Sequence, residues 1–290
     1  ALLTSPIGEE IFRKSEDIDT IYSVANPVLP RLCNLIGRMA LQKYDTALIF
    51  HASQRPILPF CKFLNIPNII ATENHCKGLD DLLTIAVVDK HHHEIERRLD
   101  IVRAVTPIKS DSLLTFELSD DEKLKSTKPF AVIHPGAQDK FKQWHPRHFI
   151  TVGKHLAKLG LNVIVTGGNN ECEIVTEIAN AIPNAKNSAG KLSLRSLAAH
   201  IDAAKLIVTN DTGPMHLGFA MNTPTFAVFT PTDPRICGPH KAKNAEIFKA
   251  EITCLPCLKK RCRQPFCMEQ ISPSRIIEAI DRIGQNGWSL

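Results

Sequence analysis

Short apolar runs alternate with longer amphipathic stretches along most of this chain. Runs of four to six apolar residues without a polar alternation are typical of strands whose two faces are both covered, and the intervening stretches have helical periodicity. Strands are expected at about 1–5, 18–24, 45–50, 66–71, 130–134, 162–166, 206–209 and 225–229. Helices are expected at about 7–14, 29–43, 55–64, 93–105, 146–159, 171–182 and 194–203, the last with Ser193 as its N-cap, and residues 72–92 are expected to form a long loop.

A polar stretch at 106–128 interrupts this alternation, which then restarts. A chain of 290 residues is also long for a single hydrophobic core. The sequence therefore predicts two Rossmann-like, doubly wound α/β domains that face each other across a cleft. We assign 1–125 to an N-terminal domain and 126–290 to a C-terminal domain.

One turn in the second half has the features of a phosphate site. Asp211, Thr212 and Gly213 follow a buried strand, and Pro214 suits the first residue of a helix. The free amides and the positive dipole end of such a helix hold anions, and His216 lies within its first turn. The alternative is a capped turn of no functional consequence.

Three further turns follow strands of the same predicted sheet, and ligands bind at the carboxyl ends of parallel strands. The first carries Gly136, Ala137 and Gln138 before Lys142, whose ammonium suits a diphosphate, and before Trp144, which we expect to anchor the loop by packing.

Gly167 and Glu171 belong to the turn after the next strand. Glu171 either complements the dipole of the helix that follows or accepts hydrogen bonds from a ribose or base. The last turn, at 230–234, contains two prolines that make it rigid, and a purely structural role is equally consistent with it.

Taken together, these segments resemble glycosyltransferase family 9, which contains the ADP-heptose:lipopolysaccharide heptosyltransferases. The segments that carry the resemblance are His134-Pro135-Gly136, Lys142-Gln143-Trp144, Thr166-Gly167-Gly168, Asn210-Asp211-Thr212-Gly213-Pro214-Met215-His216 and 229–234. The first half is similar more loosely, through Leu3-Thr4-Ser5-Pro6, Tyr44-Asp45 and the helix near His93.

The resemblance implies a GT-B architecture and inverting transfer from an ADP-sugar to a lipopolysaccharide-core acceptor. It makes 1–125 the acceptor-side domain and 126–290 the nucleotide-sugar-binding domain. It places Lys142 at the donor phosphates and Glu171 at the adenosine. Asp211, Thr212, Gly213 and His216 would line the diphosphate and sugar site, and Gly136, Ala137, Gln138 and Gly167 complete the expected donor-binding set. Backbone amides and a lysine can stabilise a leaving diphosphate, and no Asp-x-Asp pair suited to a divalent ion on the donor is evident, so we expect transfer to need no cofactor.

Members of this family begin with a strand and a Gly-Asp turn that supplies the presumed general base. That piece has no counterpart before Leu2-Leu3-Thr4-Ser5-Pro6, so the first strand and turn of the N-terminal domain are expected to be missing. We interpret this as truncation; loss of the base and of activity is the alternative. The catalytic role that remains is charge stabilisation by Lys142.

A cysteine cluster near the C-terminus has no part in this donor site. Cys254, Cys257, Cys262 and Cys267 are separated by two, four and four residues, so four thiolates could hold a structural zinc ion or an iron–sulfur cluster. Reduced cysteines in a loop, or a pair of disulfides, are the alternatives. His91-His92-His93 point in different directions around a helix, so we interpret them as a solvated helix start.

Composition narrows the partners and the compartment. A net charge of +5 suits an anionic substrate or a weak attraction to an acidic membrane surface, whereas dispersed basic residues and 6% aromatics argue against a nucleic-acid binder. No apolar run approaches the roughly 18 residues of a membrane span. Nine cysteines, five of them scattered singly, favour a reducing compartment. We expect a cytoplasmic enzyme, peripheral at the inner membrane, with an ADP-sugar donor and a lipid-linked saccharide acceptor.

Two other functions are compatible with the same residues. A nucleotide-sugar epimerase on the same two-domain plan would need acidic catalytic groups from both domains and no acceptor. A non-catalytic nucleotide- or metal-binding regulatory module would account for the missing first strand and for the cysteine cluster.

Overall fold

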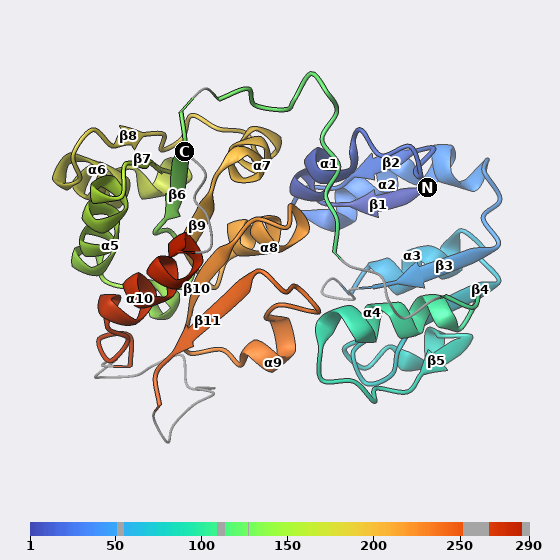
Figure 1. The fold of residues 1–290 in the computed structure, drawn as a ribbon. Helices are drawn as coiled ribbons and strands as arrows, with labels where there is room; N and C mark the ends of the chain where they lie inside the picture. Colours follow the sequence, from blue (N-terminus) through green and yellow to red (C-terminus); the bar gives the residue numbers. More distant parts are fainter. Residues whose placement is uncertain (51–54, 109–113, 127, 252–266, 286–290) are drawn as a thin grey trace. The chain divides into compact units, whose positions relative to one another are not determined.

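A computed structural model describes residues 1–50, 55–108, 114–126, 128–251 and 267–285 (Figure 1). The chain forms two compact units. Unit 1 comprises Ala1–Ser112 with Arg235–Cys237, and unit 2 comprises Leu113–Pro234 with Gly238–Leu290.

Unit 1 is built from parallel strands joined by helices. Strands β1 and β2 pair with each other, and β3, β4 and β5 form a three-stranded sheet in that order. Their bounds are β1 Leu2–Thr4, α1 Pro6–Phe12, β2 Ile21–Ser23, α2 Val28–Ala40, β3 Thr46–Ile49, α3 Ile57–Phe63, β4 Asn68–Thr72, η1 Asp80–Leu82, β5 Ile85–Val87 and α4 Glu94–Arg103.

The long loop expected at 72–92 is wrong in part, because it contains η1 and β5. Strand β5 pairs in parallel with β4 from Ile70 to Thr72. It has only three residues, Ile85, Ala86 and Val87, of which two are exposed. An apolar run this short and this exposed lacks the pattern that marks a buried strand.

Unit 2 is a six-stranded parallel sheet with the order β11-β10-β9-β6-β7-β8. Its elements are β6 Phe130–His134, η2 Lys140–Lys142, α5 Pro146–Lys158, β7 Asn162–Val165, η3 Asn169–Glu171, α6 Cys172–Ala181, β8 Lys186–Asn187, α7 Leu194–Ala203, β9 Leu206–Asn210, α8 Gly213–Ala220, β10 Thr225–Phe229, β11 Ala245–Lys249 and α10 Pro273–Gln285. The short helix α9, Pro234–Cys237, consists almost wholly of the segment Arg235–Cys237 that belongs to unit 1.

Both faces of this sheet are covered by helices. Ala131 and Ile133 of β6 belong to one buried cluster with residues of α5, α6 and α10, while Phe130 and Val132 belong to another with α7 and α8. All five residues of β6, β9 and β10 are buried, as a strand covered on both faces requires (Figure 1). The predicted Rossmann-like α/β fold class is confirmed.

The later part of the polar stretch at 106–128 packs onto the core of unit 2. Phe116 and Leu118 lie against the buried cluster under α7. The guanidinium of Arg195, 3% exposed, donates to Glu122 through Nε at 2.6 Å and also to the carbonyl of Glu117 at 2.7 Å. This segment therefore belongs to unit 2, and the compact units divide at Ser112 rather than near 125.

Among the described residues, no helix combines the length and the apolar character that crossing a bilayer requires.

Candidate functional site

The turns that carry the predicted site residues meet at one edge of the unit 2 sheet. Strands β10, β9, β6 and β7 are neighbours in the sheet and run parallel. Their carboxyl ends therefore lie side by side, and the four turns that follow them form one continuous polar rim.

Lys142 and Asp211 form the charged centre of this rim. The Lys142 ammonium lies 2.6 Å from Oδ2 of Asp211, and the Asp211 side chain is 4% exposed while that of Lys142 is 24% exposed. The hydroxyl of Thr232 donates to the same Oδ2 atom. The carboxylate thus holds the ammonium in place from the buried side, and Lys142 retains donors for a second anion.

Asn210 joins the turns after β9 and β6. Its Oδ1 accepts a hydrogen bond from the amide of Trp144 at 3.1 Å, and its Nδ2 donates to the carbonyl of Pro135 at 2.7 Å. Trp144 is fully buried, and its indole donates to the carbonyl of Ile271 at 3.0 Å. The prediction that Trp144 anchors the loop by packing is confirmed, and this anchoring fixes the position of Lys142.

Helix α8 begins beside the Lys142–Asp211 pair. Thr212 is its N-cap residue, but the Thr212 side chain makes no capping hydrogen bond. Gly213 is exposed, and a Cβ atom added there would meet no heavy atom within 4 Å. The first turn of α8 therefore combines a positive dipole end with open space, which is the arrangement that binds a phosphate.

His134 and Glu171 connect the β6 and β7 turns. His134 is buried, its Nδ1 lies 3.0 Å from the hydroxyl of Thr166, and its Nε2 lies 3.9 Å from Oε2 of Glu171. Burial lowers the pKa of His134 from 6.5 to about 4, although the nearby Glu171 carboxylate opposes this. The imidazole is therefore neutral at physiological pH.

The carboxylate of Glu171 occupies the space above Gly136. Its Oε2 accepts from the amide of Gly168 at 2.7 Å, and a Cβ atom on Gly136 would lie 2.0 Å from Oε1. Gly136 is thus glycine at least in part to make room for this carboxylate. One Glu171 oxygen atom caps the turn, which leaves the other for a ligand.

The remaining predicted residues lie on the same rim. The carbonyl of Ala137 accepts from Gln143 at 2.8 Å, and Gln138 is exposed. Gly167 packs closely on α6, where a Cβ atom would lie 2.7 Å from Val175. His216 is half-buried, with its ring 5.8 Å from that of Phe219. Sequence reasoning assigned no site role to Asn210 or Thr232, the two residues whose side chains connect the turns.

The predicted cysteine cluster is only partly within the described residues. Cys254, Cys257 and Cys262 lie outside them. Cys267 is half-buried and accepts a hydrogen bond from the Thr230 hydroxyl at 3.3 Å. Within the described part of the chain, no three His, Cys, Asp or Glu side chains are grouped so that they could hold a metal ion.

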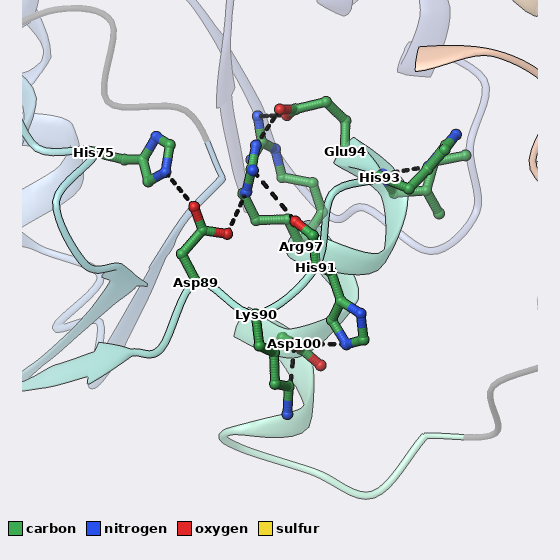
Figure 2. Close-up of polar contacts among 10 residues, drawn as sticks. His75, Asp89, Lys90, His91, His93, Glu94, Arg97 and Asp100 are labelled. Carbon is green, nitrogen blue, oxygen red and sulfur yellow. Dashed lines mark hydrogen bonds and ion pairs between the residues drawn. The ribbon is translucent and has the colours of Figure 1, made fainter. Parts of the chain in front are cut away.

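The histidine run lies directly before α4, so the predicted solvated helix start is correct only in part. His93 is the N-cap residue, and its Nδ1 accepts from the amide of Ile95 at 3.2 Å. His91 instead lies 3.2 Å from the buried carboxylate of Asp100 (Figure 2). The two side chains have different partners.

Comparison with known proteins places these features in one family. The profile of glycosyltransferase family 9 (heptosyltransferase) matches residues 61–267. Lipooligosaccharide heptosyltransferase 2 of Campylobacter jejuni is 28% identical over 206 residues, which is 67% of this chain and 65% of that protein. The match thus spans somewhat less than two thirds of the length of that curated relative.

Two solved structures from Escherichia coli share the fold. ADP-heptose LPS heptosyltransferase II superposes with a TM-score of 0.76 at 20% identity, over 98% of this chain and 89% of the other. Heptosyltransferase WaaC with ADP gives a TM-score of 0.76 at 17% identity, over 97% and 88%.

Proposed function

Because this chain belongs to glycosyltransferase family 9, we propose that it transfers a heptose-like sugar, with inversion, from an ADP-sugar to a lipopolysaccharide-core or related saccharide acceptor. The Lys142–Asp211 pair at the start of α8 is the observation that carries this proposal. The ammonium of Lys142 and the N-terminus of α8 lie at the same place, and this combination suits the diphosphate of a nucleotide-sugar.

In this proposal, Lys142 acts on the leaving group. Breaking the bond between the anomeric carbon and the diphosphate leaves a negative charge on the phosphate oxygen. Lys142 and the first amides of α8 lie in fixed positions before the reaction, so they stabilise that charge without having to reorganise. Asp211 is itself an anion, so its role is to orient the ammonium of Lys142, and the ammonium is the group that meets the phosphate.

Glu171 and Gly167 are proposed to hold the nucleoside. The Oε1 atom of Glu171 is available to accept hydrogen bonds from ribose hydroxyl groups, because Oε2 is used by the amide of Gly168. Gly136, Ala137, Gln138, Thr212, Gly213 and His216 complete the donor-binding rim. The relatives that are named for ADP-heptose or are bound to ADP support adenine as the base.

Transfer on this plan requires no cofactor, and the cysteine cluster is proposed to have a structural role at most. We further propose that the protein works in the cytoplasm, peripherally at the inner membrane, where a lipid-linked acceptor would be found. Its net charge of +5 is consistent with attraction to an acidic membrane surface.

A coupled assay tests the proposal. ADP release from ADP-heptose is measured with and without a heptose-deficient lipooligosaccharide core. Acceptor-dependent release that falls at least tenfold in Lys142→Ala supports a transferase. Turnover of the donor without any acceptor would instead favour an epimerase, and donor binding without turnover would favour the regulatory module.

A further inference from the structure

Helix α2 of unit 1 buries one of its faces and leaves an apolar stripe on another (Figure 1). Leu32 and Met39 on the buried face belong to a core cluster of the unit. The stripe consists of exposed apolar or small residues that recur every four positions: Leu29, Cys33, Gly37 and Leu41, the last being the C-cap residue. Residues at this spacing are neighbours along one side of a helix, so the stripe runs the whole length of α2.

The two leucines of this stripe are widely open to solvent. Leu29 is 59% exposed and Leu41 is 81% exposed. A Cβ atom added at Gly37, between them, would meet no heavy atom within 4 Å, so no other part of the described chain covers the stripe there. Single exposed apolar residues are common on protein surfaces, but a continuous row of them indicates an interaction site.

Only positive charge accompanies the stripe. The chain has no acidic residue between Asp19 and Asp45, and this segment contains all of α2. Arg38 lies one turn before the end of the stripe, Arg31 lies two turns earlier on the same side, and Lys43 follows the helix. All three basic side chains are exposed, so the uncovered face has a formal charge of +3.

A helix face that only meets water commonly carries both signs of charge. Helix α4 of the same unit does so, because Glu94 pairs with Arg97 and Arg98, and Asp100 pairs with Arg103. Helix α2 has no acidic side chain of its own that could pair with its arginines. Exposure to water alone therefore does not account for exposed leucines together with unbalanced positive charge.

The end of α3 repeats this combination. Phe63 is 64% exposed and follows Lys62 in the last turn, and the sequence has no acidic residue between Asp45 and Glu73. Phe60 of α3 packs in the same buried cluster as α2. Because the two helices are neighbours, the end of α3 adds to the apolar and basic character of this side of unit 1.

We propose that the exposed face of α2 docks on an acidic lipid bilayer. Leu29 and Leu41 enter the boundary between headgroups and acyl chains, and Arg31 and Lys43 meet the anionic headgroups, as in amphipathic helices that lie in a membrane surface. A second copy of this chain is a poor occupant, because a two-fold interface would set the same positive charges against each other. The inference rests on the proposed work at the inner membrane and names the surface that holds the protein there.

Vesicle flotation with the whole chain tests the inference. Vesicles of phosphatidylcholine mixed with phosphatidylglycerol provide an acidic surface, and vesicles of phosphatidylcholine alone provide a neutral one. Neither contains a saccharide acceptor. We expect the chain to partition onto acidic vesicles about tenfold or more strongly than onto neutral ones, and less strongly at high salt, which screens the attraction.

Variants separate the roles of the two kinds of side chain. Leu29→Gln and Leu41→Gln each remove one inserted side chain and should each weaken partition about tenfold, as the loss of one buried leucine predicts. Arg31→Gln and Lys43→Gln should each weaken partition onto acidic vesicles about fivefold and leave partition onto neutral vesicles almost unchanged.

Matched control variants lie in unit 2. Leu159→Gln and Lys186→Gln replace an exposed leucine and an exposed lysine outside α2, and each should change partition less than about twofold. Every variant should unfold at the wild-type temperature, because only exposed side chains are altered. Arg38 is left unchanged, because its guanidinium lies 5.4 Å from the centre of the Tyr22 ring and contributes to packing.

Two results would overturn the inference. If acidic and neutral vesicles bind equally, or if Leu41→Gln and Arg31→Gln partition like wild type, α2 is not the docking face. If light scattering instead shows that the free chain is a dimer and that Leu41→Gln dissociates it, the face belongs to a second copy.

Acceptor-dependent release of ADP from ADP-heptose, measured on the same samples, separates this inference from the proposed function. If wild type releases ADP but does not dock, only the membrane surface is wrong and the transferase stands. If wild type docks but releases no ADP, the proposed transfer fails and the membrane surface stands.

Discussion

Replacing Gly213 by alanine should separate donor binding from folding. An alanine Cβ atom would meet no heavy atom within 4 Å, and the φ angle of Gly213 is not in the positive region. Alanine also suits a helix better than glycine. The substitution should therefore leave the fold intact and add about 0.4–1 kcal/mol to the free energy of unfolding.

The same methyl group should weaken the binding of a diphosphate ligand. It would occupy the space through which a diphosphate approaches the first amides of α8. We expect the affinity for ADP to fall at least tenfold, which corresponds to about 1.4 kcal/mol. The perturbation thus has opposite effects on stability and on binding.

Thermal unfolding and calorimetric titration with ADP measure the two effects in one preparation. Gly37→Ala is a matched control, because Gly37 also lies in a helix, α2 of unit 1, and an added Cβ atom there also meets nothing within 4 Å. It should gain stability and keep its affinity for ADP. If Gly213→Ala folds and binds ADP within twofold of wild type, the phosphates do not approach this helix start and the reasoning is refuted.

Three further predictions concern groups around the site and the core of unit 2. Gly136→Ala displaces the Glu171 carboxylate from the amide of Gly168 and should cost about 1–2 kcal/mol in urea unfolding, with weaker ADP binding; unchanged affinity would exclude Glu171 from the donor site. The lowered pKa of His134 means that the unfolded chain binds a proton that the folded chain excludes, so stability is lost as pH falls from 6.5 towards 4. Between pH 7 and pH 5 this loss amounts to about 2 kcal/mol of the free energy of unfolding. Urea unfolding of His134→Gln should lack this pH-dependent loss. If wild type and His134→Gln lose stability equally between the two pH values, the prediction is wrong. Glu122→Gln removes the charge that pairs with buried Arg195, so we expect the free energy of unfolding to fall by about 2–3 kcal/mol. A free energy of unfolding within about 0.5 kcal/mol of wild type would argue against this.

The central strands of unit 2 could be predicted because both of their faces are buried. Each of β6, β9 and β10 is a run of five buried residues in which apolar side chains predominate. The edge strands β8 and β11 were missed. Strand β8 has two polar residues, and β11 has Glu246 and Lys249 among its five, so neither carries the signal of a covered strand.

The helix that starts near Gly213 and the order of the turns could also be predicted, because strand order along the chain and turn chemistry are local properties. The side-chain contacts between turns could not. Lys142 meets Asp211 across 69 residues, and Asn210 meets the amide of Trp144 across 66. These pairs depend on β6 and β9 being neighbours in the sheet, which no local pattern specifies.

Gly136 shows a second reason why the sequence could not predict the whole site. A glycine in a strand-end turn indicates close approach of some group to the backbone, but the sequence does not say which group. The structure contains an internal partner, the Glu171 carboxylate. The unpaired hydroxyl of buried Thr72 could not be predicted either, because it is visible only when the surrounding atoms are placed.

Calorimetric titration with ADP, UDP and GDP, with wild type and Lys142→Ala measured side by side, tests whether Lys142 binds the diphosphate of an ADP-sugar. We expect ADP to bind more tightly than UDP or GDP, and Lys142→Ala to lower the affinity for ADP at least tenfold. Failure of ADP to bind, or an affinity unchanged in Lys142→Ala, would contradict it.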